Sequence, residues 1–86
     1  MAKYFTNEEI AESFGKLIRE RRMELELTQR EVAQMADVDQ TYIGLLEKGE
    51  RVLTLPVAMR MCIALGLNLN EYTEPYFEPY IKTPQP

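Results

Sequence analysis

Three hydrogen-bonding side chains follow one another in the sequence, at Gln40, Thr41 and Tyr42. A glutamine carboxamide carries a paired donor and acceptor that can meet N6 and N7 of adenine, and a threonine hydroxyl can serve several bases. A tyrosine hydroxyl can bond a phosphate while its ring covers a sugar. The alternative is that Gln40 and Thr41 are ordinary solvent-facing helix residues and that Tyr42 packs against the preceding helix. On the first interpretation, Gln40 and Thr41 are suited to reading nucleic-acid bases and Tyr42 to contacting the nucleic-acid backbone.

The chain offers little for catalysis. It contains no histidine, which removes the usual general base and the commonest metal ligand. The sequence has no cluster with metal-ligand spacing and no phosphate-binding loop. Its single cysteine, Cys62, falls on an apolar face and is expected to pack in the core of a protein kept in a reducing compartment. We therefore predict no enzymatic activity, no catalytic or metal-binding residue and no cofactor, and the sequence implies no small-molecule ligand.

Two short helices joined by a tight turn are predicted to position the three polar residues. Thr28 and Glu31 have the spacing of a capping box, which begins the first of the two helices. A break follows, in which Val38 is a buried plug and Asp39 caps the second helix. Gly49 supplies the left-handed residue that ends it. Two such helices cross steeply, as in a helix-turn-helix, and the second helix of that motif fits a DNA major groove.

Three further helices are predicted around this pair. A long helix over 7–24 opens with another capping box, and Gly15 inside it is either a mild cost or a place where another helix comes close. A fourth helix has Pro56 in its first turn and ends at Gly66. A short fifth helix begins at Asn68. We see no strand pairs, so the expected fold is a compact all-α domain of five helices.

The chain is expected to divide into this helix-turn-helix domain over 1–73 and a short tail over 74–86. The tail is rich in proline and carries four apolar or aromatic anchors, Tyr76, Phe77, Tyr80 and Ile81. In an extended form, it could lie over a groove on its own domain or on a second subunit. The N-terminus turns acidic before any apolar region forms, and no apolar stretch is long enough to span a membrane. We therefore expect a cytoplasmic protein without a membrane contact.

The net charge of −4 opposes a nucleic-acid partner, because proteins that bind nucleic acids usually present a basic surface. Even the segment 28–53 carries three basic and five acidic residues. The face on which the charges lie matters more than their sum. We expect Glu31 and Asp39 to be committed to helix caps and Glu47 to be paired internally. The arginines at 19, 21 and 22 are interpreted as a solvated cluster that complements the dipole at the end of a helix.

Five segments carry a resemblance to a known family. They are IRERR, LTQREVAQMA, VDQTYI, LEKGER and IALGLNLNEY, which lie in this order between Phe14 and Tyr72. In this order and at this spacing, they resemble the Cro/phage-repressor (Xre-type) helix-turn-helix family. The resemblance implies a sequence-specific transcriptional regulator, either a phage-type repressor or a restriction–modification controller. Such a protein binds a pseudo-palindromic operator in double-stranded DNA as a homodimer, with its third helix in the major groove.

The resemblance also implies roles for single residues. The residues expected to read base edges are Gln40, Thr41, Gly44 and Leu45. The residues expected to contact DNA phosphates are Gln29, Arg30, Tyr42, Lys48 and Arg51. An internal ion pair is expected between Arg22 and Glu47. The residues expected in the dimer interface, from the fifth helix and from the apolar tail, are Leu69, Tyr72, Tyr76 and Phe77.

Four positions depart from the family pattern or allow a second interpretation. The family often has glycine where this chain has Glu26 and Asp37, near helix ends that favour a left-handed backbone. Because glutamate tolerates that conformation poorly, the connection between the first and second helices is expected to be shaped differently. Gly44 costs roughly 1 kcal/mol relative to alanine inside a helix and removes a side chain that would have read a base. It would instead allow close approach to the DNA backbone. Leu45 suits contact with a thymine methyl group or, alternatively, with the core or a protein.

A second function remains open. An antitoxin or anti-repressor is a protein-interaction module that would use the same fold. Its acidic surface and its YFEPYI tail would then hold a protein partner.

Overall fold

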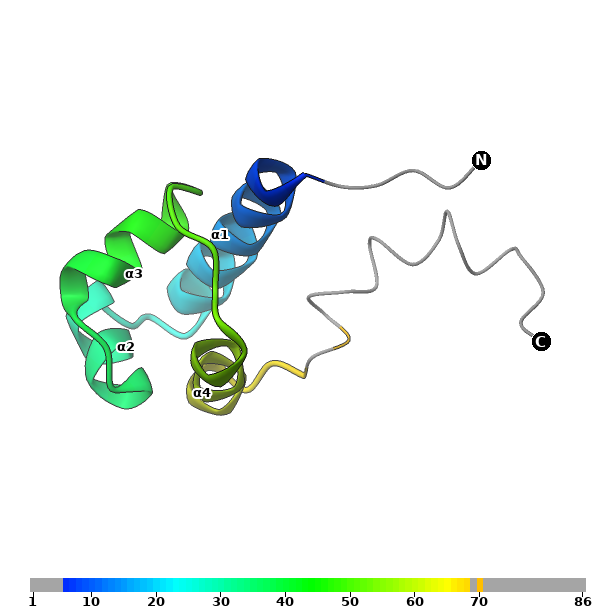
Figure 1. Cartoon of the computed structure of the whole chain (residues 1–86). Coiled ribbons are helices and arrows are strands. Elements are labelled where there is room, and N and C mark those ends of the chain that lie inside the picture. Colours follow the sequence, from blue (N-terminus) through cyan, green and yellow to red (C-terminus); the bar gives the residue numbers. More distant parts are fainter. Residues whose placement is uncertain (1–5, 69, 71–86) are drawn as a thin grey trace, which may run out of the picture.

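The computed structural model describes residues 6–68 and 70, and these form four helices and no strand (Figure 1). The helices are α1 (Asn7–Glu24), α2 (Gln29–Ala36), α3 (Gln40–Glu47) and α4 (Leu55–Leu65). The all-α prediction is confirmed, with four helices in the described part where five were expected. The predicted fifth helix falls almost wholly outside the described residues, as do the tail and the expected dimer contacts Leu69, Tyr72, Tyr76 and Phe77.

Local capping boxes determine where α1 and α2 begin. The Thr28 hydroxyl accepts from the Glu31 amide at 3.0 Å, and the Glu31 carboxylate accepts from the Thr28 amide at 2.9 Å. The same reciprocal pair at Thr6 and Glu9 opens α1. These two hydrogen bonds satisfy amides that a helix start would otherwise leave unpaired. Both predicted capping boxes are therefore confirmed, and α1 has the predicted bounds.

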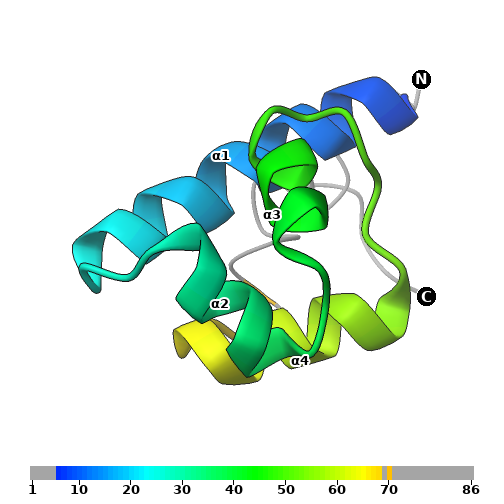
Figure 2. The same ribbon diagram turned by 90° about the vertical axis from the view of Figure 1, so that its left-hand side faces the viewer.

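The core lies where the four helices meet. Figure 2 shows α2 and α3 side by side in front of α1, with α4 along the lower edge. The apolar side chains of this core are Ile18, Val32, Ala33, Ala36, Ile43, Leu46, Met61, Leu65 and Leu67. Val38 and Cys62 pack against it and are only partly buried. Val38 thus packs on the core from the turn as predicted, but both Val38 and Cys62 are less enclosed than expected.

Gly15 is the point where α1 and α3 come closest. A Cβ atom built on this glycine would overlap the Leu46 carbonyl oxygen and lie 3.0 Å from the Glu47 carbonyl oxygen. Neither atom belongs to a flexible side chain, so no side chain can be accommodated without moving one helix. Of the two explanations offered by the sequence, close approach of another helix is correct.

Glu26 and Asp37 both adopt the left-handed conformation, each with a φ of 56°. The expectation that the first connection differs because glutamate avoids this region was wrong. The Leu27 amide bonds the Arg22 carbonyl at 3.0 Å, which holds the chain through this turn. Such hydrogen bonds offset the cost of the backbone conformation.

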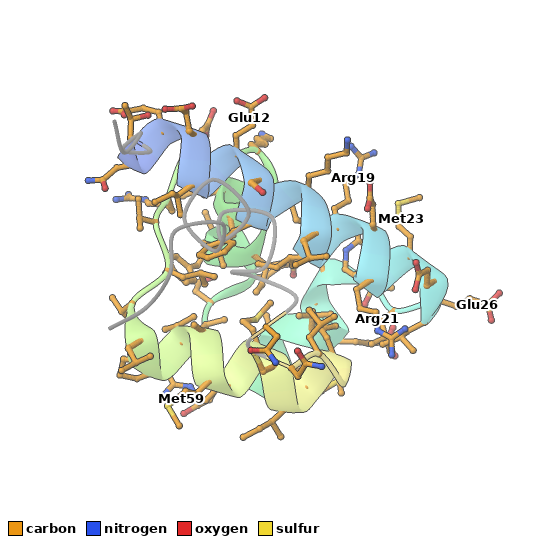
Figure 3. The ribbon with its side chains drawn as sticks, turned by 90° about the vertical axis from the view of Figure 1, so that its right-hand side faces the viewer. Glu12, Arg19, Arg21, Met23, Glu26 and Met59 are labelled. Carbon is orange, nitrogen blue, oxygen red and sulfur yellow. The ribbon has the colours of Figure 1, made fainter. Side chains whose placement is uncertain are left out.

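Two arginines connect helices that are distant in sequence. Arg21 Nε donates to the Leu65 carbonyl at 2.9 Å, and Arg60 Nε donates to the Ala36 carbonyl at 2.8 Å. Each acceptor is the last residue of a helix, where carbonyl groups lack partners within the helix. Figure 3 shows Arg21 reaching from the end of α1 toward the end of α4. The interpretation of the arginine cluster in α1 as solvated was therefore wrong for Arg21, and it is also wrong for Arg22, described below.

Within the described residues, no helix combines the length and the apolar composition needed to cross a membrane.

Candidate nucleic-acid interface

One face of α3, from its N-cap to its C-cap, and the start of α2 surround an open hollow of about 520 Å³. Its lining residues are Gln29, Asp39, Gln40, Thr41, Gly44, Leu45 and Lys48. All four residues predicted to read bases belong to this set. Of the five predicted to contact phosphates, it contains Gln29 and Lys48. The structure therefore gathers residues from two helices into one concave surface.

Burial of the opposite side of α3 explains why these residues line the hollow. Ile43 is 0% exposed and Leu46 is 1% exposed, so this helix is fixed against α1 and α2. Asp39 Oδ1 accepts from the Thr41 amide at 3.0 Å and sets the first turn. Gln40 and Thr41 then lie exposed at the N-terminal end of the helix, where hydrogen-bonding groups remain free for a ligand.

Gly44 and Leu45 continue this surface one turn later. A Cβ atom built on Gly44 would lie 3.7 Å from Oε1 of Gln29 and 4.0 Å from its Nε2, which is ordinary van der Waals contact. Packing therefore does not require a glycine at this position. Leu45 is half-buried, so it is less exposed than its place off the inner face suggested.

Arg22 and Glu47 form the predicted ion pair beside the hollow. Arg22 Nε lies 2.6 Å from Glu47 Oε2, and Nη2 lies 3.1 Å from Oε1. The side chains are 15% and 5% exposed, respectively. Hydrogen bonding to Glu47 raises the pKa of Arg22, and burial opposes this shift only in part. The pair joins the end of α3 to α1.

Gln29 has a partner that sequence reasoning missed. Its Nε2 donates to Glu47 Oε1 at 3.1 Å, so the carboxamide belongs to the same network as the ion pair. One amide hydrogen is used in this way and the second remains available. The sequence carried no local signal for this contact, because Gln29 and Glu47 are 18 residues apart, at the start of α2 and the end of α3.

Tyr42 lies apart from its two sequence neighbours. It is half-buried, its ring packs against the core, and its hydroxyl donates to the Val52 carbonyl at 3.4 Å. It is absent from the lining of the hollow. Among the three adjacent polar residues, only Gln40 and Thr41 therefore present their side chains to this surface.

Near the hollow, three acidic side chains have partners within the protein, whereas three basic side chains have none among the described residues. The Glu31 carboxylate accepts from the Thr28 backbone amide, and this hydrogen bond lowers the pKa of Glu31. Asp39 caps α3, and Glu47 is paired. Within the described part of the chain, by contrast, no side-chain hydrogen bond or ion pair involves Arg30, Lys48 or Arg51, all of which are exposed. Glu31, Asp39 and Glu47 are thus committed internally, while these three basic groups are available; Asp37 and Glu50 are exposed.

Among the described residues, no group of three potential ligands lies close enough together to hold a metal ion. The hollow is lined by hydrogen-bonding side chains, by one carboxylate (Asp39) and one lysine (Lys48), and by the apolar side chain of Leu45. Its chemistry is therefore suited to a surface that offers hydrogen-bonding groups.

Comparison with known proteins relates this architecture to regulators. A family model described as helix-turn-helix matches residues 18–72. The restriction-modification controller protein C.AhdI from Aeromonas hydrophila has a similar structure, with 29% sequence identity and a TM-score of 0.69 over 72% of this chain and 94% of that one. The clp gene regulator ClgR from C. glutamicum is 27% identical, with a TM-score of 0.70 over 73% of this chain and 81% of that one.

A third structure extends the comparison to a DNA complex. It is the restriction-modification controller protein C.Esp1396I, a tetramer in complex with its natural 35 base-pair operator. It is 22% identical, with a TM-score of 0.68 over 84% of this chain and 95% of that one, so the likeness concerns the fold. No curated protein sequence matches the chain.

Proposed function

Since the chain belongs to the Xre-type helix-turn-helix family, we propose that it is a DNA-binding transcriptional regulator that reads an operator with α3. The observation that carries this proposal is the hollow between α2 and α3, which collects Gln40, Thr41, Gly44 and Leu45 on one exposed surface. The similarity to the controller protein C.AhdI and the regulator ClgR supports it. In this proposal α3 lies in the major groove, Gln40 and Thr41 bond base edges, and Leu45 contacts a thymine methyl group.

The phosphate contacts come from the rim of this surface. Lys48 lies on the hollow, Arg30 follows Gln29 in the first turn of α2, and Arg51 stands in the loop after α3. All three basic side chains are exposed and without an internal partner in the described part of the chain. Gln29 has one amide hydrogen left to donate. A phosphate contact by Tyr42 is less well supported, because its hydroxyl already donates to Val52.

We further propose that the protein acts as a homodimer on a pseudo-palindromic operator. One recognition helix contacts too few base pairs to be specific in a genome, and a dimer doubles the reading surface. Three apolar side chains of α4 are exposed, at Leu55, Met59 and Ile63. They support a protein contact through α4. The proposed interface continues into Leu69, Tyr72, Tyr76 and Phe77, so that residues 1–73 form the binding domain and 74–86 contribute to association.

Substitutions that remove either a phosphate-contacting side chain or a base-contacting side chain test the proposed function. Selection from a random duplex library provides the best site, and affinities are then measured over a salt series. Lys48→Ala and Arg51→Ala should weaken binding to all sequences alike and flatten the plot of log affinity against log salt by about 0.9 for each phosphate that is no longer neutralised. Gln40→Ala should leave this slope nearly unchanged and cost about 1–3 kcal/mol at one symmetric base position.

The two patterns are opposite, which makes the experiment decisive. If Gln40→Ala and Lys48→Ala lose affinity in the same sequence-independent manner, α3 does not lie in the groove. Failure to select any DNA motif, together with tight stoichiometric binding of another protein, would instead favour the antitoxin or anti-repressor function. The apolar residues of α4 and the acidic surface would then serve that partner.

A further inference from the structure

A second, smaller hollow adjoins the first and has a different chemical character. It has a volume of about 270 Å³. Its lining residues are Arg19, Arg22, Gln29, Gly44, Glu47 and Lys48. Gln29, Gly44 and Lys48 line both hollows, so the two form one continuous depression. The smaller one lies where α1, the start of α2 and the end of α3 meet.

The lining of the smaller hollow is cationic although the protein is acidic. Three basic side chains and one carboxylate line it, which leaves a formal charge of +2 in a chain of net charge −4. The single carboxylate, Glu47, is 5% exposed and accepts hydrogen bonds from Arg22 and Gln29. Its charge is therefore compensated within the wall. What a ligand meets is the remaining positive charge.

Arg19 and Lys48 provide that charge from two different helices. Both side chains are exposed, and neither forms a hydrogen bond or an ion pair with any other described residue. Figure 3 shows Arg19 projecting from α1 away from the ribbon, whereas Arg21 turns back toward the fold. Arg22, which lies one turn further along α1, points inward to Glu47. Arg19 is thus the arginine of this cluster that remains free to bind a ligand.

The donors available here suit a phosphodiester. A guanidinium group can bind two phosphate oxygens at once, and an ammonium group adds a second point charge. The free amide hydrogen of Gln29 is a third donor, and its orientation is set by the hydrogen bond to Glu47. Gly44 adds no side chain that would fill the depression.

We propose that this hollow holds a backbone phosphate of bound DNA between Arg19 and Lys48, and that Arg19 is a phosphate ligand supplied by α1 from outside the helix-turn-helix. This inference rests on the proposed function and adds a DNA-binding residue to it. It also explains how an acidic protein presents a positive surface beside its reading helix: the acid in the site is buried and paired, while the two bases are left unpaired. The Arg22–Glu47 pair then positions Gln29 and does not itself bind the phosphate.

The test compares Arg19→Gln with Lys16→Gln in the full chain. Lys16 is a matched control because it is an exposed cation on the same helix, three residues earlier, and lines a different hollow with Glu9, Glu12 and Ser13. Both substitutions remove one positive charge. Affinity for the selected DNA site and for a random duplex is measured between 50 and 200 mM salt. Thermal unfolding of each variant checks that the fold is intact.

Arg19→Gln should reduce the salt slope by about 0.9 for each phosphate that Arg19 neutralises in the wild type. Its affinity deficit relative to wild type should therefore shrink about 3.5-fold for each such phosphate between 50 and 200 mM salt. The affinity deficit should be equal on both duplexes, because binding to a phosphate carries no sequence information. Lys16→Gln should keep the wild-type slope. Arg19→Lys should also keep most of the slope, since the charge remains.

Equal slopes for Arg19→Gln and the wild type would overturn the inference while leaving the proposed function intact. Equal affinity deficits for Arg19→Gln and Lys16→Gln would also overturn it, because they would reflect net charge and not a local interaction. A wild-type protein that binds no duplex would remove the proposed function, and this inference with it.

Discussion

Two glycines in the middle of helices have opposite surroundings. At Gly15, a Cβ atom would overlap a carbonyl oxygen of α3, whereas at Gly44 it would only touch the Gln29 carboxamide at 3.7 Å. A glycine inside a helix is less stable than alanine by about 0.8–1 kcal/mol when nothing opposes the added methyl group. The first glycine is therefore required by packing. The second stabilises nothing in the isolated protein.

The same substitution should consequently have opposite effects at these two positions. Gly15→Ala should lower the free energy of unfolding by about 1–3 kcal/mol, because α1 must move away from α3. Gly44→Ala should raise it by up to about 1 kcal/mol through helix propensity alone. Urea unfolding followed by circular dichroism measures both. Destabilisation by Gly44→Ala would show that this glycine has a structural role that its surroundings do not reveal.

Gly44→Ala also bears on function. If the glycine permits close approach to DNA, the variant should bind its selected site more weakly although its fold is more stable. Such a combination separates a binding role from a folding role.

The Arg22–Glu47 pair provides a second prediction at this scale. Glu47→Ala should lower the free energy of unfolding by about 3 kcal/mol, because it leaves a largely buried guanidinium uncompensated. Glu24→Ala is the control: Glu24 pairs with Arg21 at 3.2 Å but is 65% exposed, and such pairs contribute about 0–1 kcal/mol. The denaturation midpoints of the two variants should differ clearly. Equal midpoints would mean that the Arg22–Glu47 pair contributes no more than a surface ion pair.

At the scale of elements, the short helices depend on neighbours as much as on their own sequence. An eight-residue helix such as α2 is too short to be stable alone. Its start is held by a local capping box, but the carbonyl of its last residue, Ala36, is bonded by Arg60 of α4. The last residue of α4, Leu65, is bonded in the same way by Arg21 of α1. Long-range arginine hydrogen bonds thus complete helix ends.

Arg60→Met tests this arrangement, because it keeps an unbranched apolar stem and removes the donor. It should lower the free energy of unfolding by about 1.5–3 kcal/mol, the value of a hydrogen bond that involves a charged group; here the acceptor is a partly buried carbonyl. Arg30→Met, at an exposed arginine without an internal partner in the described residues, should leave stability within about 0.5 kcal/mol of wild type. Similar effects of the two substitutions would show that the Arg60 hydrogen bond does not stabilise the end of α2.

At the scale of the whole molecule, the distribution of charge matters more than its sum. The net charge is −4, yet three of the five acids between residues 28 and 53 are engaged in caps or in the buried pair. The exposed Arg30, Lys48 and Arg51 have no side-chain partner among the described residues. A charge that is buried and paired contributes little to the potential that an approaching polyanion meets. The overall acidity therefore does not oppose the proposed DNA binding as strongly as composition alone indicates.

The proposed dimer gives the prediction at this scale. Light scattering should find two chains on each selected DNA site, and the site should have two-fold symmetry with half-site centres about 10 bp apart. Combined replacement of Tyr76, Phe77 and Tyr80 by serine should weaken association if the tail contributes. Combined replacement of Met59 and Ile63, which are exposed on α4, tests the helical part of the interface. A single chain both free in solution and on its best site would contradict the dimer.

The sequence by itself determined the elements and the family. Thr28 and Glu31, or Asp39 and Thr41, interact across two or three residues, so their spacing alone predicts where a helix begins. The Arg22–Glu47 pair, 25 residues apart, was predictable only because the resemblance to a family supplied it. Within the described residues, the candidate base-reading surface was predicted from the same two sources, local residue spacing and the resemblance to the family.

Only the tertiary structure decided where the long side chains reach. Arg19, Arg21 and Arg22 looked alike in the sequence, but one stays free, one bonds a carbonyl 44 residues away and one enters a buried pair. Tyr42 turned to the core although its neighbours Gln40 and Thr41 face outward. The physical reason is that an arginine has many rotamers of similar intrinsic energy, so the packing of other helices selects among them. That selection depends on groups distant in sequence, which local spacing cannot specify.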